Sequence, residues 1–178
     1  SGMNLTMGQL GHIGERDLPL IFHEQLPLLD LDAIRDVELR EMVLRWQAMC
    51  DQDDDIPVWD MTFAMEFPRL AGRCFLYELN GDEVHTKFIG EQSRKYLNLE
   101  RTSGDLFELI PEVNVRDIHA RILKCVKQRL PNYCQKSMSW NDRRDHLDYE
   151  AIFLPFRKAD DEVCRVVYSP MSFYPHHE

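Results

Sequence analysis

The chain has 178 residues, of which 44% are hydrophobic, which is enough for one domain with a substantial core. Its net charge of -10 and its pI of about 5.1 argue against nucleic acid or an anionic membrane as a partner. No apolar run approaches the roughly 18–20 residues that a membrane span needs. The N-terminus lacks the basic and then apolar pattern of a secretory signal, so we expect a cytoplasmic protein.

The cysteines do not predict a disulfide framework. Their number is odd, no pair has C-x-x-C spacing, and each lies in a segment of apolar pattern. We therefore expect reduced core cysteines in a cytosolic protein. They are Cys50, Cys74, Cys125, Cys134 and Cys164.

The N-terminal region divides into an irregular lead-in and a helix. Residues 1–30 are interrupted by several Gly and Pro residues, and Ser1-Gly2 is typical of a cloning remnant. The spacing of apolar residues predicts a helix from Leu31 to Cys50, which Asp30 or Asp32 can cap.

This helix is apolar on two sides. One side carries Ile34, Val37, Leu44 and Ala48. The other is spaced like a coiled-coil seam and consists of Leu39, Val43, Trp46 and Cys50. Such a helix either packs one side on its own domain and the other on a partner, or lies with both sides buried in one core. The sequence pattern alone does not distinguish these two alternatives.

The acidic run at 51–55 resembles a calcium loop in part. Ile56 stands where that loop needs Gly, and Thr62 stands where it needs a bidentate Glu. We interpret the run as a solvated helix end.

A β-hairpin is the strongest local signal in the chain. Residues 74–79 alternate so that Phe75, Tyr77 and Leu79 share one face, Asn80-Gly81-Asp82 follows, and residues 84–89 form a second β-rich run. Asn-Gly between two such runs favours a tight turn, because its central positions require positive φ.

The remaining elements follow from periodicity and from breakers. Short helices are expected at Met61–Phe67, Glu91–Tyr96 and Leu106–Ile110, and a long one at Glu112–Leu130. The polar face of the long helix carries Asp117, Arg121, Lys124 and Gln128. Three strands should follow, at Tyr133–Trp140, His146–Leu154 and Val163–Phe173. Because Pro170 fits poorly in a central strand, we expect the last strand to end there or to lie at an edge.

This order of elements is that of a PAS domain, and sequence detail resembles the compact stand-alone bacterial PAS family. Four features carry the resemblance over roughly residues 31–173. They are an aromatic helix residue before a Leu/Pro segment, a basic-apolar-apolar-Gly run, a Gly-x-Leu-Phe-x-Leu run and an aromatic-Glu-x-x-x-Leu-Pro strand. Here they are Trp46 with Glu66–Leu70, Lys87–Gly90, Gly104–Leu109 and Tyr149–Pro155.

The resemblance implies an α+β fold in which a five-stranded antiparallel sheet carries helices on one face, with an additional N-terminal helix. The PAS-like domain would span residues 59–175, and residues 31–58 would be a helix and linker used for dimerisation. Members of the family often dimerise in this way, which makes the seam of Leu39, Val43, Trp46 and Cys50 the candidate interface.

PAS domains also often hold a small ligand between the sheet and its helices. The candidate pocket wall is rich in aromatic residues, as such sites are. It consists of Phe88, Tyr96, Phe107, Ile118, His119, Ile122, Trp140, Tyr149 and Ile152. The alternative is that these side chains fill the core completely.

His119 raises the possibility of haem, because some PAS domains bind iron through a histidine on their long helix. The alternative is a histidine satisfied by a backbone carbonyl. Flavin photochemistry is disfavoured, since no cysteine lies between Cys74 and Cys125.

Enzymatic motifs do not stand out. The chain has no phosphate-binding loop, H-E-x-x-H or G-x-S-x-G motif, and His146 and Asp148 are more typical of a solvated strand edge than of a catalytic pair. We therefore expect a non-catalytic sensory domain that binds a small ligand or a protein partner and signals to a separate output protein. The alternative is a ligand-free dimerisation module.

Overall fold

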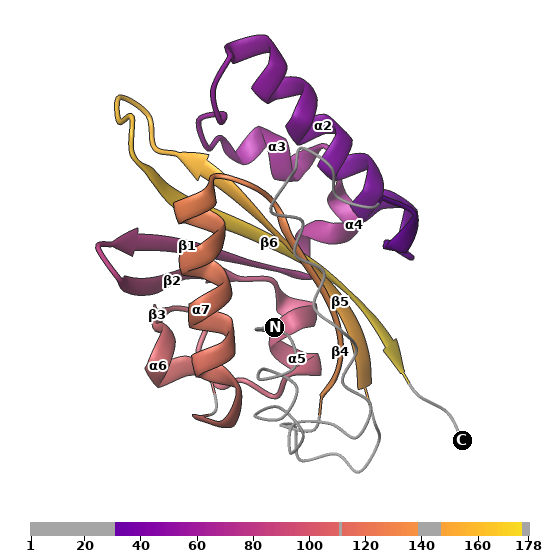
Figure 1. The fold of residues 1–178 in the computed structure, drawn as a ribbon. Helices are drawn as coiled ribbons and strands as arrows, with labels where there is room; N and C mark the ends of the chain where they lie inside the picture. The colour runs from indigo at the N-terminus through magenta and orange to yellow at the C-terminus, as the bar shows by residue number, and fades with distance from the viewer. Residues whose placement is uncertain (1–30, 111, 139–146, 176–178) are drawn as a thin grey trace, which may run out of the picture.

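The computed structural model describes residues 31–110, 112–138 and 147–175, which form a six-stranded antiparallel sheet with helices on both sides (Figure 1). Trp140 and His146 lie outside the described residues. The strands follow the order β3-β2-β1-β6-β5-β4. Their bounds are β1 Cys74–Asn80, β2 Glu83–Ile89, β3 Gly104–Asp105, β4 Asn132–Met138, β5 Leu147–Arg157 and β6 Cys164–Pro175.

The prediction of five strands was wrong by one. The additional strand β3 has only two residues and pairs with β2 through His85↔Asp105 and Thr86↔Gly104. Gly104 adopts a φ of 135°, which side-chain-bearing residues rarely do. Pattern reading does not detect so short a strand.

The hairpin of β1 and β2 is confirmed. Asn80 pairs with Glu83, so the turn consists of Gly81 and Asp82. Only Gly81 takes a positive φ, of 62°, whereas the prediction had both central positions positive.

Strand β6 lies in the centre of the sheet, between β1 and β5, so the prediction of an edge position was wrong. Pairing with β5 runs as far as Ala151↔Met171 and resumes at Leu154↔Tyr168, and Pro170 falls in that gap. The ladder with β1 reaches Pro170 at its last pair, Cys74↔Pro170. A proline without an N–H is therefore accommodated where one ladder is interrupted.

The N-terminal helix begins later than predicted. A short 3-10 turn, η1 (Leu31–Ala33), precedes α2 (Val37–Asp53). Asp36 caps α2, because its Oδ1 accepts hydrogen bonds from the amides of Glu38 at 2.8 Å and Leu39 at 3.3 Å. The acidic residues 51–55 are exposed at the far end, so the interpretation as a solvated helix end is confirmed.

The other helices lie close to their predicted positions. They are α3 (Met61–Met65), α4 (Pro68–Ala71), α5 (Glu91–Tyr96), α6 (Leu106–Leu109) and α7 (Glu112–Gln128). In α7, Val115, Ile122 and Cys125 are buried, as the helical spacing predicted. The helix ends where Arg129 takes a φ of 57° and the Leu130 amide donates to the Cys125 carbonyl at 3.3 Å.

Helices cover both faces of the sheet, so the prediction of helices on one face was wrong (Figure 1). We call the face toward α5–α7 the inner face and the face toward α2–α4 the outer face. Alternate residues of β5 serve the two: Ala151 and Phe153 belong to the inner core, Ile152 and Leu154 to the outer one. Residues 31–58 therefore share a core with the sheet.

Candidate functional site

A small cavity lies on the inner face, between the sheet and α7. Its volume is about 20 Å³, room for about one water molecule. Most of its wall is apolar or aromatic. It is lined by Phe75, Tyr77, Leu97, Ile110, Ile118, Arg121, Cys134, Tyr149, Ala151, Phe153, Ser169 and Met171.

Arg121 is the one charged residue among the described residues of this wall, and it is only 2% exposed. Its Nε donates to Asp117 Oδ2 at 2.9 Å, and its Nη2 lies 2.8 Å from the same oxygen without forming a well-directed hydrogen bond. Its Nη1 has no hydrogen-bond partner among the described residues. Leaving a buried charged donor unpaired is costly, so this position calls for an acceptor.

The guanidinium of Arg121 stays charged. Burial works to lower its pKa, but the neighbouring acidic groups outweigh burial and raise it, and of these Asp117 is the ion-pair partner. Burial raises the pKa of the Tyr149 hydroxyl well above its ordinary value, so that group is neutral at physiological pH. The wall of the cavity therefore combines one fixed positive charge with neutral polar groups.

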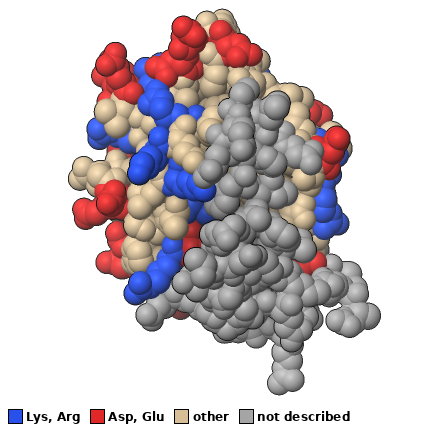
Figure 2. Space-filling model, viewed as in Figure 1, with Lys and Arg blue, Asp and Glu red and all other residues tan. Residues whose placement is uncertain are grey.

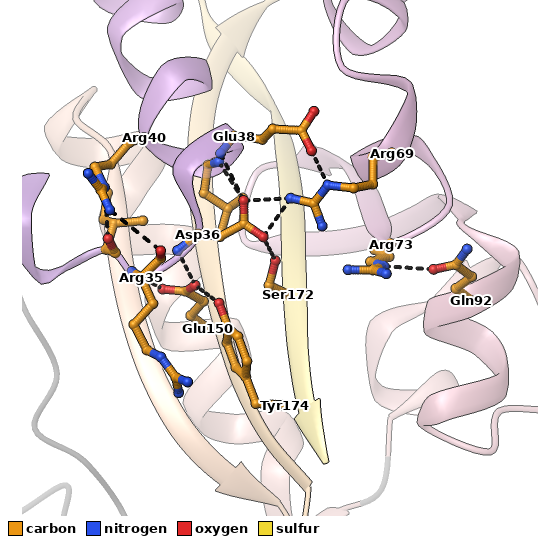
Figure 3. A network of polar contacts seen from close by, with 12 residues as sticks. Arg35, Asp36, Glu38, Arg40, Arg69, Arg73, Gln92, Glu150, Ser172 and Tyr174 are labelled. Atoms are coloured by element: carbon orange, nitrogen blue, oxygen red, sulfur yellow. Dashed lines mark hydrogen bonds and ion pairs between the residues drawn. The ribbon is translucent and has the colours of Figure 1, made fainter.

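The outer face carries a buried carboxylate, Glu150, which is 0% exposed (Figure 3). Its Oε1 accepts from the Arg35 amide at 2.9 Å and the Tyr133 hydroxyl at 2.6 Å. Its Oε2 accepts from the Asp36 amide at 2.8 Å and from the Tyr174 hydroxyl. We call this group of Glu150, Tyr133, Tyr174 and the backbone of residues 35–36 the clasp.

Both tyrosines of the clasp act as donors. Burial, together with the hydrogen bond to Glu150, raises the pKa of Tyr133 and of Tyr174 above the ordinary phenol value. Because both hydroxyls keep their protons, Glu150 has four donors for its two oxygens, and a buried carboxylate needs such partners.

Further polar contacts extend the clasp to α4 (Figure 3). Arg69 contacts both oxygens of Asp36 at 2.6 Å and also pairs with Glu38. Ser172 donates to Asp36. The Arg35 guanidinium lies 3.7 Å from the centre of the Tyr174 ring, a cation–π contact. The start of α2 is thereby held to α4 and to β6 as well as to β5.

A second contact holds the middle of α2. The Trp46 indole N–H donates to the Pro155 carbonyl at 2.9 Å, and the Trp46 side chain is 2% exposed. Two residues of the Tyr-Glu-x-x-x-Leu-Pro run of β5 thus hold this helix. Glu150 binds the backbone just before its start, and Pro155 binds Trp46 in its middle. Tyr149 of the same run instead faces the cavity.

The cavity and the clasp share three strands. In β4, Cys134 lines the cavity while Tyr133 belongs to the clasp. In β5, Tyr149 lines the cavity while Glu150 belongs to the clasp. In β6, Met171 lines the cavity while the next residue, Ser172, bonds to Asp36. Side chains alternate along a strand, so the two sites lie on opposite faces of the same backbone.

The predicted pocket wall is partly brought together. Ile118 and Tyr149 line the cavity, Ile122 is buried in the inner core, and Tyr96 stacks on Phe173 with ring centres 4.4 Å apart. The remaining described aliphatic and aromatic members do not contribute: Phe88 and Phe107 are 41% and 50% exposed, and Ile152 lies on the outer face. Trp140 lies outside the described residues.

His119 does not line the cavity. Its Nε2 lies 2.7 Å from the Asp82 carbonyl at the hairpin turn, and its ring packs edge-on against Phe107 with centres 5.1 Å apart. This is the arrangement of the alternative, a histidine satisfied by a backbone carbonyl. The described residues contain no cluster of three His, Cys, Asp or Glu side chains that could hold a metal ion.

The predicted dimer seam packs inside the chain. Leu39, Val43 and Trp46 are buried in the outer core, and Cys50 is partly buried against it. The opposite side of α2 faces outward, with Val37 57% and Leu44 54% exposed. The assignment of the candidate interface to the seam is therefore corrected: these side chains bind the sheet of their own domain.

Sequence reasoning missed both Arg121 and Glu150. Arg121 was assigned to the polar face of α7, although it directly precedes the buried Ile122. The signal for Glu150 was a single charge within the apolar run 149–154. Such a charge in a strand that is buried on both faces indicates a partnered group.

The surface in Figure 2 mixes both signs of charge, with Lys and Arg gathered along α7 and Asp and Glu at the end of α2. All five cysteines are free, four of them buried. No described helix could span a membrane, being too short or too polar. In comparisons with known proteins, no family model matches the chain, and no curated protein or solved structure is significantly similar to it.

Proposed function

We propose that the chain is a non-catalytic, PAS-type sensory domain that binds a small ligand in the inner cavity and signals through α2 to a separate output protein. The observation that carries this proposal is the alternation in β4, β5 and β6, which gives each strand one residue at the cavity and its neighbour at the contacts that hold α2.

The mechanism is a population shift. A ligand at Tyr149 or Cys134 changes the position of β5 and β4, and the same backbone carries Glu150 and Tyr133 to or from the amides of residues 35–36. A ligand that prefers one arrangement shifts α2 between docked and released states by its difference in affinity. Coupling energies of this kind are typically about 1–3 kcal/mol.

The sequence resemblance and the architecture both support the proposal. The described residues form one antiparallel sheet with the long helix α7 packed on one face, as a PAS-like domain requires. The packing of α2–α4 on the second face and the short β3 depart from the expected arrangement.

The test is to fill the cavity and observe the other face. Ala151→Val adds two carbons at the cavity wall, and hydrogen exchange should then change at the amides of Arg35 and Asp36 across the sheet. Val84→Ile is the control, since Val84 is buried on the inner face but lines no part of the cavity. Equal protection of both amides in the wild type and in Ala151→Val would refute the coupling.

A ligand-free dimerisation module is the second candidate. It is favoured by the outward side chains of Val37 and Leu44 and by a cavity with room for about one water molecule. Leu44→Glu should then reduce the mass in light scattering from twice 21.1 kDa to 21.1 kDa. Val163→Glu, at a side chain 53% exposed and outside α2, should not. A wild-type monomer at micromolar concentration would remove this candidate.

A further inference from the structure

We propose that the inner cavity binds the carboxylate group of a small organic acid, with Arg121 as its anchor. This inference rests on the proposed ligand-binding function and names the chemical class of the ligand. It starts from Arg121, which lines the cavity and whose buried Nη1 has no hydrogen-bond partner among the described residues.

The geometry of the ion pair leaves one side of the guanidinium open. Asp117 approaches the side formed by Nε and Nη2 through its Oδ2, at 2.9 and 2.8 Å. The side formed by Nη1 and Nη2 therefore retains two parallel N–H groups. A carboxylate matches such a pair with two hydrogen bonds, which a monatomic anion cannot do.

The surroundings make this contact strong. Arg121 is 2% exposed, and it is the one charged side chain among the twelve described residues that line the cavity. Asp117 keeps contact with solvent, since its side chain is 14% exposed. In a low-dielectric cavity a hydrogen bond to a charged group gains more than it would in water.

The size and composition of the cavity describe the rest of the ligand. A volume of about 20 Å³ has room for about one water molecule, so even formate requires some movement of the wall. A larger acid must displace side chains, and Met171 is the adaptable one in the wall because its thioether chain is unbranched. Phe75, Tyr77 and Phe153 would then contact an apolar or aromatic body.

The experiment is a thermal-shift series on the full chain with formate, acetate, propionate and benzoate. The amides formamide, acetamide, propionamide and benzamide serve as neutral isosteres, and sodium chloride at equal ionic strength serves as the salt control. At least one acid should raise the Tm by roughly 5–10 °C at about 100 times its Kd. Its amide and chloride should leave the Tm unchanged.

Variants assign the effect to Arg121. Arg121→Lys keeps the charge but loses the paired donors, so the Kd for the acid should rise at least about tenfold. Arg121→Gln should abolish the shift. Arg116→Gln, an exposed arginine on the same helix, should bind the acid like the wild type. Because Arg121→Gln can fail to fold, Arg121→Lys is the deciding variant.

Three results would overturn the proposal: no acid gives a larger shift than chloride, an amide binds as tightly as its acid, or Arg121→Lys binds the acid unchanged. The failure of this inference is distinguishable from that of the sensor mechanism. If Ala151→Val alters exchange at residues 35–36 but no acid binds, the ligand class is wrong and the coupling holds. If an acid binds but leaves those amides unchanged, the site holds and the sensor mechanism fails.

Discussion

Glu150→Gln tests the clasp with the smallest change of shape. The carboxylate accepts four hydrogen bonds, two on each oxygen. In glutamine one oxygen becomes an NH₂ group, which cannot accept. The tyrosine hydroxyl that faced this oxygen can rotate and accept a hydrogen bond from the new NH₂ group. The backbone N–H that faced the same oxygen cannot accept, so that N–H is left without a partner.

The expected loss of stability follows from these four bonds. A hydrogen bond to a charged group contributes about 1.5–3 kcal/mol, and an unpaired buried donor costs about 1–3 kcal/mol. One broken bond and weaker remaining ones give a destabilisation of about 2–4 kcal/mol. For a domain of this size that corresponds to a Tm lowered by roughly 5–15 °C.

Urea unfolding and hydrogen exchange measure the effect. Exchange at the amides of Arg35 and Asp36 should accelerate more than exchange in the central strand β6, because the start of α2 is released first. Glu162→Gln, at an exposed residue, is the matched control and should stay within about 0.5 kcal/mol of the wild type. If Glu150→Gln also stays within that range and the two amides remain protected, the clasp does not hold α2.

Further predictions concern α2, a glycine contact, pH and the thiols. Trp46→Phe removes the donor to Pro155 and some buried volume, so urea unfolding should show a loss of about 2–4 kcal/mol, and an unchanged midpoint would contradict that contact. Gly90→Ala should destabilise the fold by at least about 1–3 kcal/mol, because the new Cβ would lie 2.4 Å from the Gly72 carbonyl. Gly72→Ala is the control and should be tolerated, since its Cβ would meet only the Gln92 side chain, at 3.6 Å. Equal urea-unfolding midpoints for the two variants would be inconsistent with this difference. Burial acts to raise the pKa of Asp36, but hydrogen bonds from Arg69, Ser172 and the Leu39 amide hold that pKa below its ordinary value. The ionised carboxylate therefore stabilises the fold above about pH 3.9, and this stabilisation is lost as the pH falls through the lower pKa of the folded state. Unfolding midpoints measured across this range should show a smaller acid loss in Asp36→Asn than in the wild type, and identical profiles would argue against Asp36. Burial raises the pKa of Cys50 and Cys164 to about 12 and of Cys74 to about 11, so a thiol reagent at pH 8 should react slowly with all three in the folded protein, and a rapid phase assigned to any of them would contradict this burial.

Local patterns predicted those parts of the fold that depend on local physics. The hairpin followed from alternation and Gly81, and α7 followed from helical spacing ending at Pro131. The helix start was misplaced because Asp30, Asp32 and Asp36 are chemically equal as caps. Asp36 is selected by its contacts with Arg69 and Ser172, distant in sequence.

The site was less predictable, because its groups are partnered over long sequence distances. Glu150 bonds to amides more than a hundred positions away, which no local window contains. The seam of α2 was recognised as apolar, but its partner was not: the Pro155 carbonyl directs Trp46 onto the sheet of its own chain. Pro170 was misjudged because the proline rule applies to each ladder separately, and only the ladder to β5 is interrupted.

The far end of α2 is held differently from its start. Beyond Trp46 no residue of the helix is fully buried, although Met49 and Cys50 pack partly buried against the outer core. Just past the helix, Asp55 forms ion pairs with Arg129 at 2.5 Å and with Arg157 at 3.5 Å, in which Asp55 and Arg129 are about 40% exposed. Surface pairs of this kind contribute up to about 1 kcal/mol and weaken with salt. We therefore expect the amides in the last turns of α2 to exchange faster than those at its start, which Glu150 holds to the sheet.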